Sequence, residues 1–133
     1  MTTASGHLVV LSTVGTAEDA ERIGRALVEG GLAACVNVVP AVTSIYRWKG
    51  KLEREQECLL VIKTRAERFE ALREALVALH PYEVPEVLAL PVVAGHRPYL
   101  EWLDTNVNVR FVRRRPARGP GRPAGPPRPR SPR

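Results

Sequence analysis

The order of apolar and polar residues predicts a strand and then a helix at the start of the chain. Residues 7–14 contain a continuous apolar run, which is typical of a short strand buried on both faces. Thr16 precedes Asp19 by three residues, as in a capping box, and apolar residues then recur at helical spacing. Gly30 and Gly31 mark the end of this helix.

Two long strands joined by a tight turn follow. Residues 33–48 are rich in Val, Thr, Ile and aromatic side chains, and Pro40 among them predicts a kink or bulge. The Lys-Gly-Lys segment 49–51 supplies the turn, and residues 53–63 return as the second strand. The pattern therefore predicts a long, bent hairpin.

The remaining pattern predicts a second helix, a rigid loop, a fourth strand and a third helix. Thr64 opens a second capping box, and the helix that follows it ends before Pro81. Residues 80–86 hold two prolines and read as a loop into a strand at 87–93. Pro98 suits the first turn of a short third helix.

This order, β-α-β-β-α-β followed by α, predicts an α+β domain with a ferredoxin-like antiparallel sheet and an extra C-terminal helix. In that arrangement both main helices cover one face of the sheet and leave the other bare. Residues 58–62 are all apolar, so alternation along the strand makes both faces apolar. A bare apolar face on a small domain indicates an interface, and we therefore expect self-association.

Composition divides the 133-residue chain into a flexible start at 1–6, one domain at 7–112 and a disordered tail at 113–133. The tail holds eight arginines and no acid, so subtracting its charge from the net +6 leaves −2 for residues 1–112. The domain therefore has no general attraction for nucleic acid. The tail reads as a solvated terminus, with binding to nucleic acid or an anionic surface as the minor alternative.

The sequence predicts a cytoplasmic protein. No apolar run reaches the length of a membrane-spanning helix, and the start lacks the features of a secretory signal. The predicted hairpin places Cys35 and Cys58 about 20 Å apart, which is too far for a disulfide. Free thiols suit a reducing compartment.

Candidate metal ligands are sparse. The three histidines and two cysteines are scattered without C-x-x-C or H-x-x-x-H spacing. Cys35 is most simply a small buried hydrophobic residue. Because soft thiolate and imidazole ligands favour copper or zinc, Cys35 and His80 would form a site only if the fold or a neighbouring subunit brings them together.

The densest polar cluster is the loop 80–86, with an imidazole, a phenol and two carboxylates. Such a loop can bind a ligand, or its histidine and tyrosine can bond neighbouring backbone while the prolines stiffen the turn, and both interpretations stay open. Lys63 can neutralise an anion, although an ion pair with Glu83 or Glu86 is the simpler expectation.

Aromatic residues and carboxylates meet near the hairpin turn. Tyr46 and Trp48 point to one side of their strand, and alternate residues from Glu53 to Glu57 are acidic. A solvated tip that clasps another subunit is favoured here over a ligand site. Because no phosphate loop or nucleophile elbow is present, we do not expect an enzyme, and a hydrolase or isomerase using Glu83 ranks last.

Several segments, taken in order, resemble the CutA divalent-cation tolerance family. They are residues 31–37, 44–53, 57, 62–64, 80–86 and 99–102. The resemblance covers residues 7–107 and leaves out the tail. It implies a ferredoxin-like subunit in a tight homotrimer, with hairpins extending onto neighbours and an architecture similar to PII signalling proteins. It also implies a role in tolerance of copper and other divalent cations, with no catalytic reaction.

The resemblance also assigns residues. Those that match family positions are Cys35, Trp48, Lys63, His80, Tyr82, Glu83 and Glu86. The chain departs at Ser12 and Leu79, where some metal-binding relatives carry a cysteine and a histidine. The first hypothesis is weak Cu(II) binding through Cys35 and His80 at subunit clefts. The alternative is a PII-like sensor that binds a small anionic ligand near Lys63, Trp48, Tyr82, Glu83 and Glu86.

Overall fold

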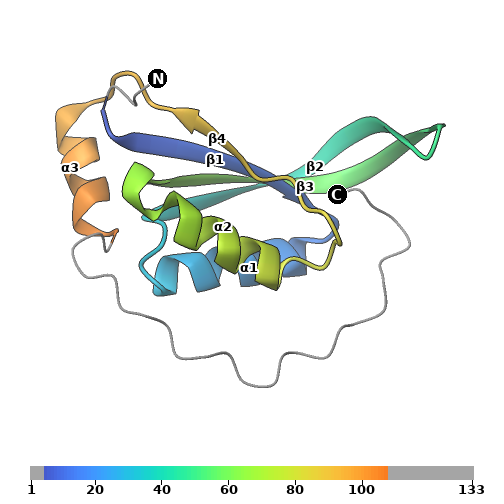
Figure 1. Ribbon diagram of the computed structural model, residues 1–133, viewed down its shortest axis with the longest axis horizontal. Helices are drawn as coiled ribbons and strands as arrows, with labels where there is room; N and C mark the ends of the chain where they lie inside the picture. Colours follow the sequence, from blue (N-terminus) through green and yellow to red (C-terminus); the bar gives the residue numbers. More distant parts are fainter. Residues whose placement is uncertain (1–4, 108–133) are drawn as a thin grey trace.

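The computed structural model describes residues 5–107, and the ends of the chain at 1–4 and 108–133, including the predicted tail, lie outside this range. Figure 1 shows the strands β1 (His7–Val14), β2 (Cys35–Trp48), β3 (Lys51–Arg65) and β4 (Leu88–Pro91). The helices are α1 (Ala17–Glu29), α2 (Phe69–Leu79) and α3 (Arg97–Thr105), and a 3-10 turn, η1 (Ala66–Arg68), precedes α2. Among the described residues, no helix has the length and apolar character needed to cross a bilayer.

The four strands form one antiparallel sheet in the order β2-β3-β1-β4. Helices α1 and α2 lie side by side against one face of it, and α3 sits at one end (Figure 1). This arrangement confirms the predicted ferredoxin-like α+β fold with an extra C-terminal helix. Strand β3 is central, because it pairs with β2 on one side and β1 on the other.

The core lies between the sheet and the helix pair. Its fully buried members include Val10 of β1, Leu60 and Ile62 of β3, Ile23 and Leu27 of α1, and Leu72 and Leu76 of α2. Burying one such side chain contributes roughly 1.5–3 kcal/mol. The apolar residues at helical spacing in α1 and the alternate apolar residues of β3 therefore pack into the same core layer.

The two predicted helix starts have different outcomes. The hydroxyl of Thr16 accepts a hydrogen bond from the backbone N–H of Asp19 at 3.1 Å, which confirms the N-cap of α1. The second predicted cap is wrong, because β3 continues through Thr64 to Arg65 and the N-cap of α2 is Arg68. The Thr64 hydroxyl instead donates to the carbonyl of Leu32 at 2.7 Å.

The hairpin between β2 and β3 has the predicted turn and bulge. Lys49 and Gly50 both have positive φ, 53° and 79°, which is typical of a two-residue hairpin turn. Near Pro40 the register shifts between Val39 and Val42, and Ala41 has a φ of 62°. Beyond the bulge the hairpin projects away from the rest of the domain (Figure 1).

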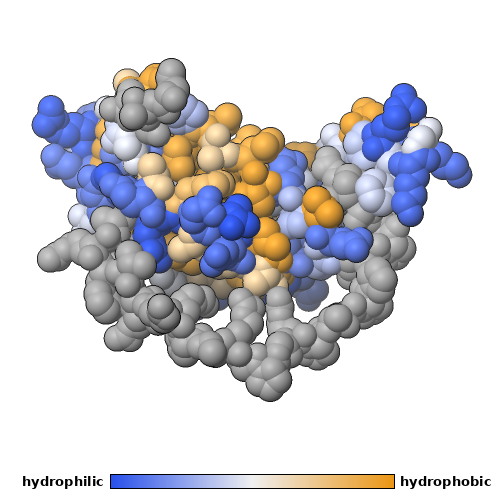
Figure 2. Space-filling model, in the orientation of Figure 1, coloured by the Kyte–Doolittle hydropathy of each residue, from blue (hydrophilic) through white to orange (hydrophobic). Residues whose placement is uncertain are grey.

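The face of the sheet opposite α1 and α2 is called the open face here, and it is apolar. Its cross-strand neighbours include Val39, Leu59, Val61, Val9, Leu11, Leu88 and Leu90. Leu88 and Leu90 are 56% and 49% exposed. Leu103 and Val107, from α3 and its end, cover one end of the sheet by packing on Ala34. Figure 2 shows apolar residues gathered across the middle of the molecule, between polar ends.

Candidate functional site

A polar cluster lies on the open face where β2 and β3 pair. Cys35 is directly opposite Lys63, and the Lys63 ammonium lies 4.0 Å from the Cys35 sulfur. The same ammonium donates a hydrogen bond to the side-chain carbonyl of Asn37. Lys63 therefore contacts residues of β2 rather than the carboxylates of the 80–86 loop.

The loop histidine is part of a buried hydrogen-bond network. His80 is 7% exposed, and its Nε2 lies 2.8 Å from the backbone carbonyl of Thr13. Its Nδ1 accepts the backbone N–H of Tyr82 at 3.1 Å. Because a carbonyl only accepts, Nε2 carries the proton, and both ring nitrogens have partners within the chain. This is the backbone-bonding role that the sequence left open.

Tyr82 extends this network to the base of the hairpin. Its hydroxyl lies 2.8 Å from Oε2 of Glu57, and the two residues are 5% and 1% exposed. The rings of His80 and Tyr82 are 4.7 Å apart. The network therefore ties the loop to both β1 and β3. Sequence reasoning missed the role of Glu57, although its place directly before the apolar run 58–62 is a signal for a buried carboxylate.

Burial lowers the pKa of His80 below its usual value. The hydrogen bond to the Thr13 carbonyl and the nearby charges of Asp19 and Glu57 act in the opposite direction, but burial dominates. His80 is therefore neutral at pH 7, which suits the observed pattern of one ring nitrogen donating and the other accepting.

Cys35 and His80 lie in different parts of one chain. Cys35 is opposite Lys63, which pairs with Val9, whereas His80 bonds Thr13. Four residues along β1 correspond to about 13 Å. Within residues 5–107, no group of three or more His, Cys, Asp or Glu side chains is arranged to hold a metal ion. Among the described residues, Cys35 and His80 therefore do not meet within one chain.

The other candidate residues also lie apart. Glu83 is exposed, whereas Glu86 is partly buried, with an oxygen 3.5 Å from the Thr13 hydroxyl. Trp48 lies at the hairpin tip, where the Lys49 ammonium is 5.5 Å from its ring centroid. Glu86 thus lies beside Thr13 near the end of β1, away from the tip.

The two positions that depart from some relatives are both structural in this chain. Ser12 is fully buried on β1, and Leu79 packs against the main core at the end of α2. Neither side chain supplies a thiolate or an imidazole, so two soft ligands are missing from these positions.

The hairpin tip carries the predicted mixture of aromatic and acidic residues. Tyr46 is directly opposite Glu53, and Ser44 is opposite Glu55, so the aromatic side chains and the carboxylates share one side of the hairpin. On the other side, Ile45 is 64% exposed and therefore presents apolar surface. The predicted juxtaposition is confirmed.

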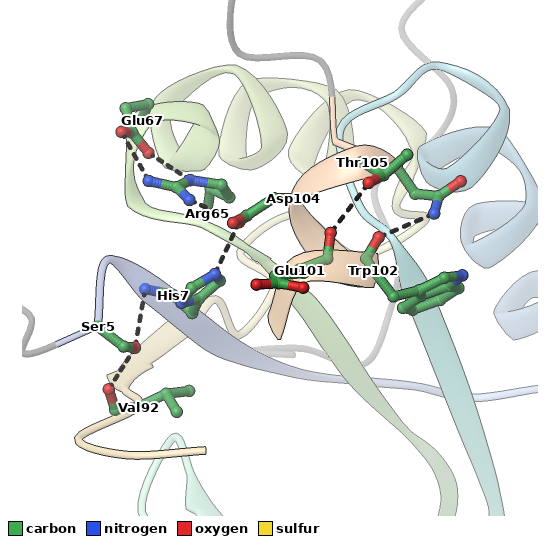
Figure 3. A network of polar contacts seen from close by, with 10 residues as sticks. Ser5, His7, Arg65, Glu67, Val92, Glu101, Trp102, Asp104 and Thr105 are labelled. Carbon is green, nitrogen blue, oxygen red and sulfur yellow. Dashed lines mark hydrogen bonds and ion pairs between the residues drawn. The ribbon is translucent and has the colours of Figure 1, made fainter. Parts of the chain in front are cut away.

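A second polar network, which the sequence did not reveal, attaches α3 to the sheet (Figure 3). Asp104 of α3 lies 2.8 Å from Nε2 of His7 and 2.5 Å from Nη1 of Arg65. Arg65 also pairs with Glu67 at 3.0 Å, and the hydrogen bond that Arg65 donates to Glu67, followed by the one that it donates to Asp104, raises the pKa of Arg65. Burial raises the pKa of Asp104, but the hydrogen bonds from Arg65 and His7 outweigh it and lower the pKa overall.

Comparison with known proteins gives a consistent result. The family model described as CutA1 divalent ion tolerance protein matches residues 8–106. The Divalent-cation tolerance protein CutA of Thermus thermophilus is 55% identical over 98 residues, which cover 74% of this chain and 95% of that protein. The Protein CutA homolog of Xenopus laevis is 57% identical over 84 residues, covering 63% of this chain and 56% of that protein.

A solved structure also agrees with the fold. The divalent cation tolerance protein Cut A1 from Thermus thermophilus superposes with a TM-score of 0.75 at 53% identity. The match covers 77% of this chain and 99% of that one. The similarity thus extends over the described domain, whereas this chain spans little more than half of the Xenopus protein.

The lowered pKa of His80 predicts a loss of stability in mild acid. The unfolded chain takes up a proton as the pH falls through about 6.5, but the folded chain resists it, so the free energy of unfolding decreases. We expect urea unfolding at fixed protein concentration to show lower stability at pH 5.5 than at pH 7.5. His80→Gln should flatten this dependence, because its amide does not titrate.

His96→Gln is the matched control, since His96 is exposed at the start of α3. It should keep the pH dependence of the wild-type protein. Equal wild-type stability at the two pH values, or a full pH dependence in His80→Gln, would contradict the assignment.

Proposed function

The chain belongs to the CutA1 divalent ion tolerance protein family, and from this premise we propose that it acts in tolerance of divalent cations as a trimer of identical chains. The match over residues 8–106 and the name of the Thermus relative support the cation role. The proposed role is binding, and it assigns no catalytic residue.

The apolar open face is the observation that carries the proposed assembly. Partly covered apolar residues such as Leu59 and Val61 lie beside the exposed Leu88 and Leu90 on it. Leaving such a surface in water is unfavourable by about 25 cal/mol per Å² of apolar area. The projecting hairpin, with Ile45 and Leu52 exposed, gives each copy an arm that can reach another. A PII-like trimer would use both surfaces.

We propose that a divalent cation such as Cu(II) binds weakly at the seams between copies, through Cys35 and the loop of His80. Cys35 is half-buried on the open face and is not in a disulfide, so its sulfur is open to a neighbouring chain. His80 would have to give up one of its two hydrogen bonds to become a ligand. This cost, together with Ser12 and Leu79 in place of softer ligands, favours low affinity.

The Lys63 cluster favours a second candidate function, which is sensing of a small anionic ligand between subunits. The ammonium group of Lys63 lies on the open face beside a side-chain amide, and ammonium and amide groups both bind carboxylate or phosphate oxygens. Tyr82, Glu83, Glu86 and Trp48 would then contribute from neighbouring chains. Such a ligand would report to a partner protein, as in a PII-like sensor.

A cytoplasmic location is part of the proposal. Both cysteines of the chain are free thiols, and disulfides are rare where glutathione and thioredoxin keep thiols reduced.

If the protein is a trimer as proposed, its molar mass in solution is three times that of the 14.7 kDa chain. We expect light scattering during gel filtration to give this mass at micromolar concentration. Leu90→Asp should lower it, because the charge lies on the open face opposite Val9. Val77→Asp is the control, since Val77 is 39% exposed on α2 in the helix layer. A monomeric wild-type protein would contradict the trimer.

The metal proposal predicts that Cys35 matters for copper affinity and Cys58 does not. In anaerobic titration calorimetry with Cu(II), Cys35→Ala should weaken binding at least tenfold, since a thiolate ligand is lost. Cys58→Ala should bind like the wild-type protein, because Cys58 is buried in the main core. Negligible heat in the wild-type protein, or equal heats in all three proteins, would rule out this site.

The sensor proposal predicts stabilisation by anions. A ligand that binds only the folded protein raises the melting temperature by mass action. In a melting screen of nucleotides and organic acids, at least one compound should stabilise the wild-type protein and lose its effect in Lys63→Gln. Lys49→Gln, at the exposed hairpin turn, should retain it. Stabilisation by metal ions alone would exclude the sensor function.

A further inference from the structure

A groove runs along the outer side of the sheet, between α1 and the edge strand β2. Its volume is about 380 Å³, and its lining includes Val28, Val36, Val38, Glu21, Arg25 and Glu29. The helix and strand approach closely at its floor, since a Cβ on Gly24 would lie 3.1 Å from a Val36 methyl group. Val28 and Val38 are nevertheless 41% and 36% exposed. The groove is thus apolar inside and mainly acidic at its rim.

The outer side of β2 also lacks a neighbouring strand within residues 5–107. An uncovered edge strand presents backbone N–H and C=O groups that can pair with another chain. The groove and this edge lie side by side along the same stretch of β2. An extended segment lying there would cover both.

The described chain ends at the entrance to this groove. Val107 packs on Ala34, which directly precedes β2, and Figure 1 shows the end of α3 close to the segment that joins α1 to β2. At 3.3 Å per residue, Val36 lies about 7 Å and Val38 about 13 Å along the strand from Ala34. The next residues of the chain therefore begin within reach of the groove.

Their sequence matches the groove in both pattern and length. From Val107 the residues Val-Asn-Val-Arg-Phe alternate between apolar and polar, as in a strand with one buried side. Residues 108–112 span about 17 Å when extended, which is enough to cover the distance of about 13 Å from Ala34 to Val38. Arg113, Arg114 and Arg115 follow directly.

Acidic residues of α1 continue along the groove beyond Val28. Val28 lies near the end of α1, and the helix runs back through Glu21 to Glu18, which is three residues earlier on the same side. A segment entering beside Ala34 would thus pass Glu29 and the apolar floor first, and would reach Glu21 and Glu18 afterwards. Arg25 is the one basic residue among those lining the groove.

We propose that residues 108–115 of the same chain lie in this groove, with Val109 and Phe111 on its apolar floor and the three arginines beside Glu21 and Glu18. The segment covers the edge of β2 and anchors the arginine-rich tail to the helix layer. Because the groove does not lie on the open face, its occupation is compatible with assembly through that face. The segment lies beyond the family match at 8–106.

Trypsin tests this proposal on the full-length protein. It cleaves after arginine unless proline follows, so the Arg110–Phe111 bond inside the docked segment can be compared with the Arg118–Gly119 bond beyond it. We expect cleavage after Arg110 to be at least tenfold slower in the folded wild-type protein, as followed by mass spectrometry. Arg118 serves as an internal control, because both bonds belong to the same molecule.

Two pairs of variants identify the groove as the cause of the protection. Val38→Asp should bring the two cleavage rates within twofold of each other, whereas Val77→Asp, at a similarly exposed valine on α2, should keep the difference. Glu21→Lys reverses a rim charge on an exposed helical residue and should raise the Arg110 rate severalfold. Glu74→Lys on the exposed side of α2 should leave it unchanged.

Three results would overturn the proposal. Equal cleavage at Arg110 and Arg118 in the wild-type protein would mean that the segment is not docked. Protection that survives both Val38→Asp and Glu21→Lys would place the segment elsewhere. Protection that disappears on tenfold dilution would mean that the groove takes the segment of another copy rather than its own.

Discussion

The structure depends on the central strand β3, which is apolar on both of its sides. On one side Leu60 and Ile62 are fully buried against the helices. On the other, Leu59 and Val61 lie on the open face, beside apolar residues of β1 and β2. A strand of this kind stabilises a domain fully only when something covers its second side. The fold of one chain therefore leaves an apolar surface that a neighbouring copy can cover.

The candidate site follows from the same geometry, because polar groups stand at two ends of the open face. Lys63 and Cys35 mark one end, and the His80 network marks the other. Inside one chain each group already has a structural role: Lys63 bonds Asn37, and His80 joins β1 to the loop. Ligand binding at either place would thus involve groups that also stabilise the fold of the subunit. This overlap connects the proposed cation and anion functions to assembly.

Local signals made most of the fold predictable from sequence. The Thr16 cap, the Lys49-Gly50 turn and the bulge beside Pro40 each depend on a few adjacent residues and were correct. The capping box at Thr64 failed because pairing with β1 extended β3 beyond the point where local preference would end it.

The site was less predictable, because its contacts join distant residues. Tyr82 and Glu57 are 25 positions apart, and His7 and Asp104 are 97 apart, so neither pair produces a local pattern. The backbone roles of His80 could be foreseen as one of two options. Choosing between them required the position of Thr13.

The bulge in β2 determines which way the hairpin's aromatic residues face. Before it, odd-numbered residues such as Cys35 and Val39 pair with odd-numbered residues of β3, and after it even-numbered residues such as Tyr46 do so. The extra residue thus shifts the phase of the alternation by one position. Tyr46 and Trp48 consequently continue the side of the sheet on which Cys35 lies. Because Cys35 and Tyr46 are an odd number of positions apart, a regular strand would place their side chains on opposite sides of the sheet, so the aromatic arm owes its present direction to one irregular backbone position.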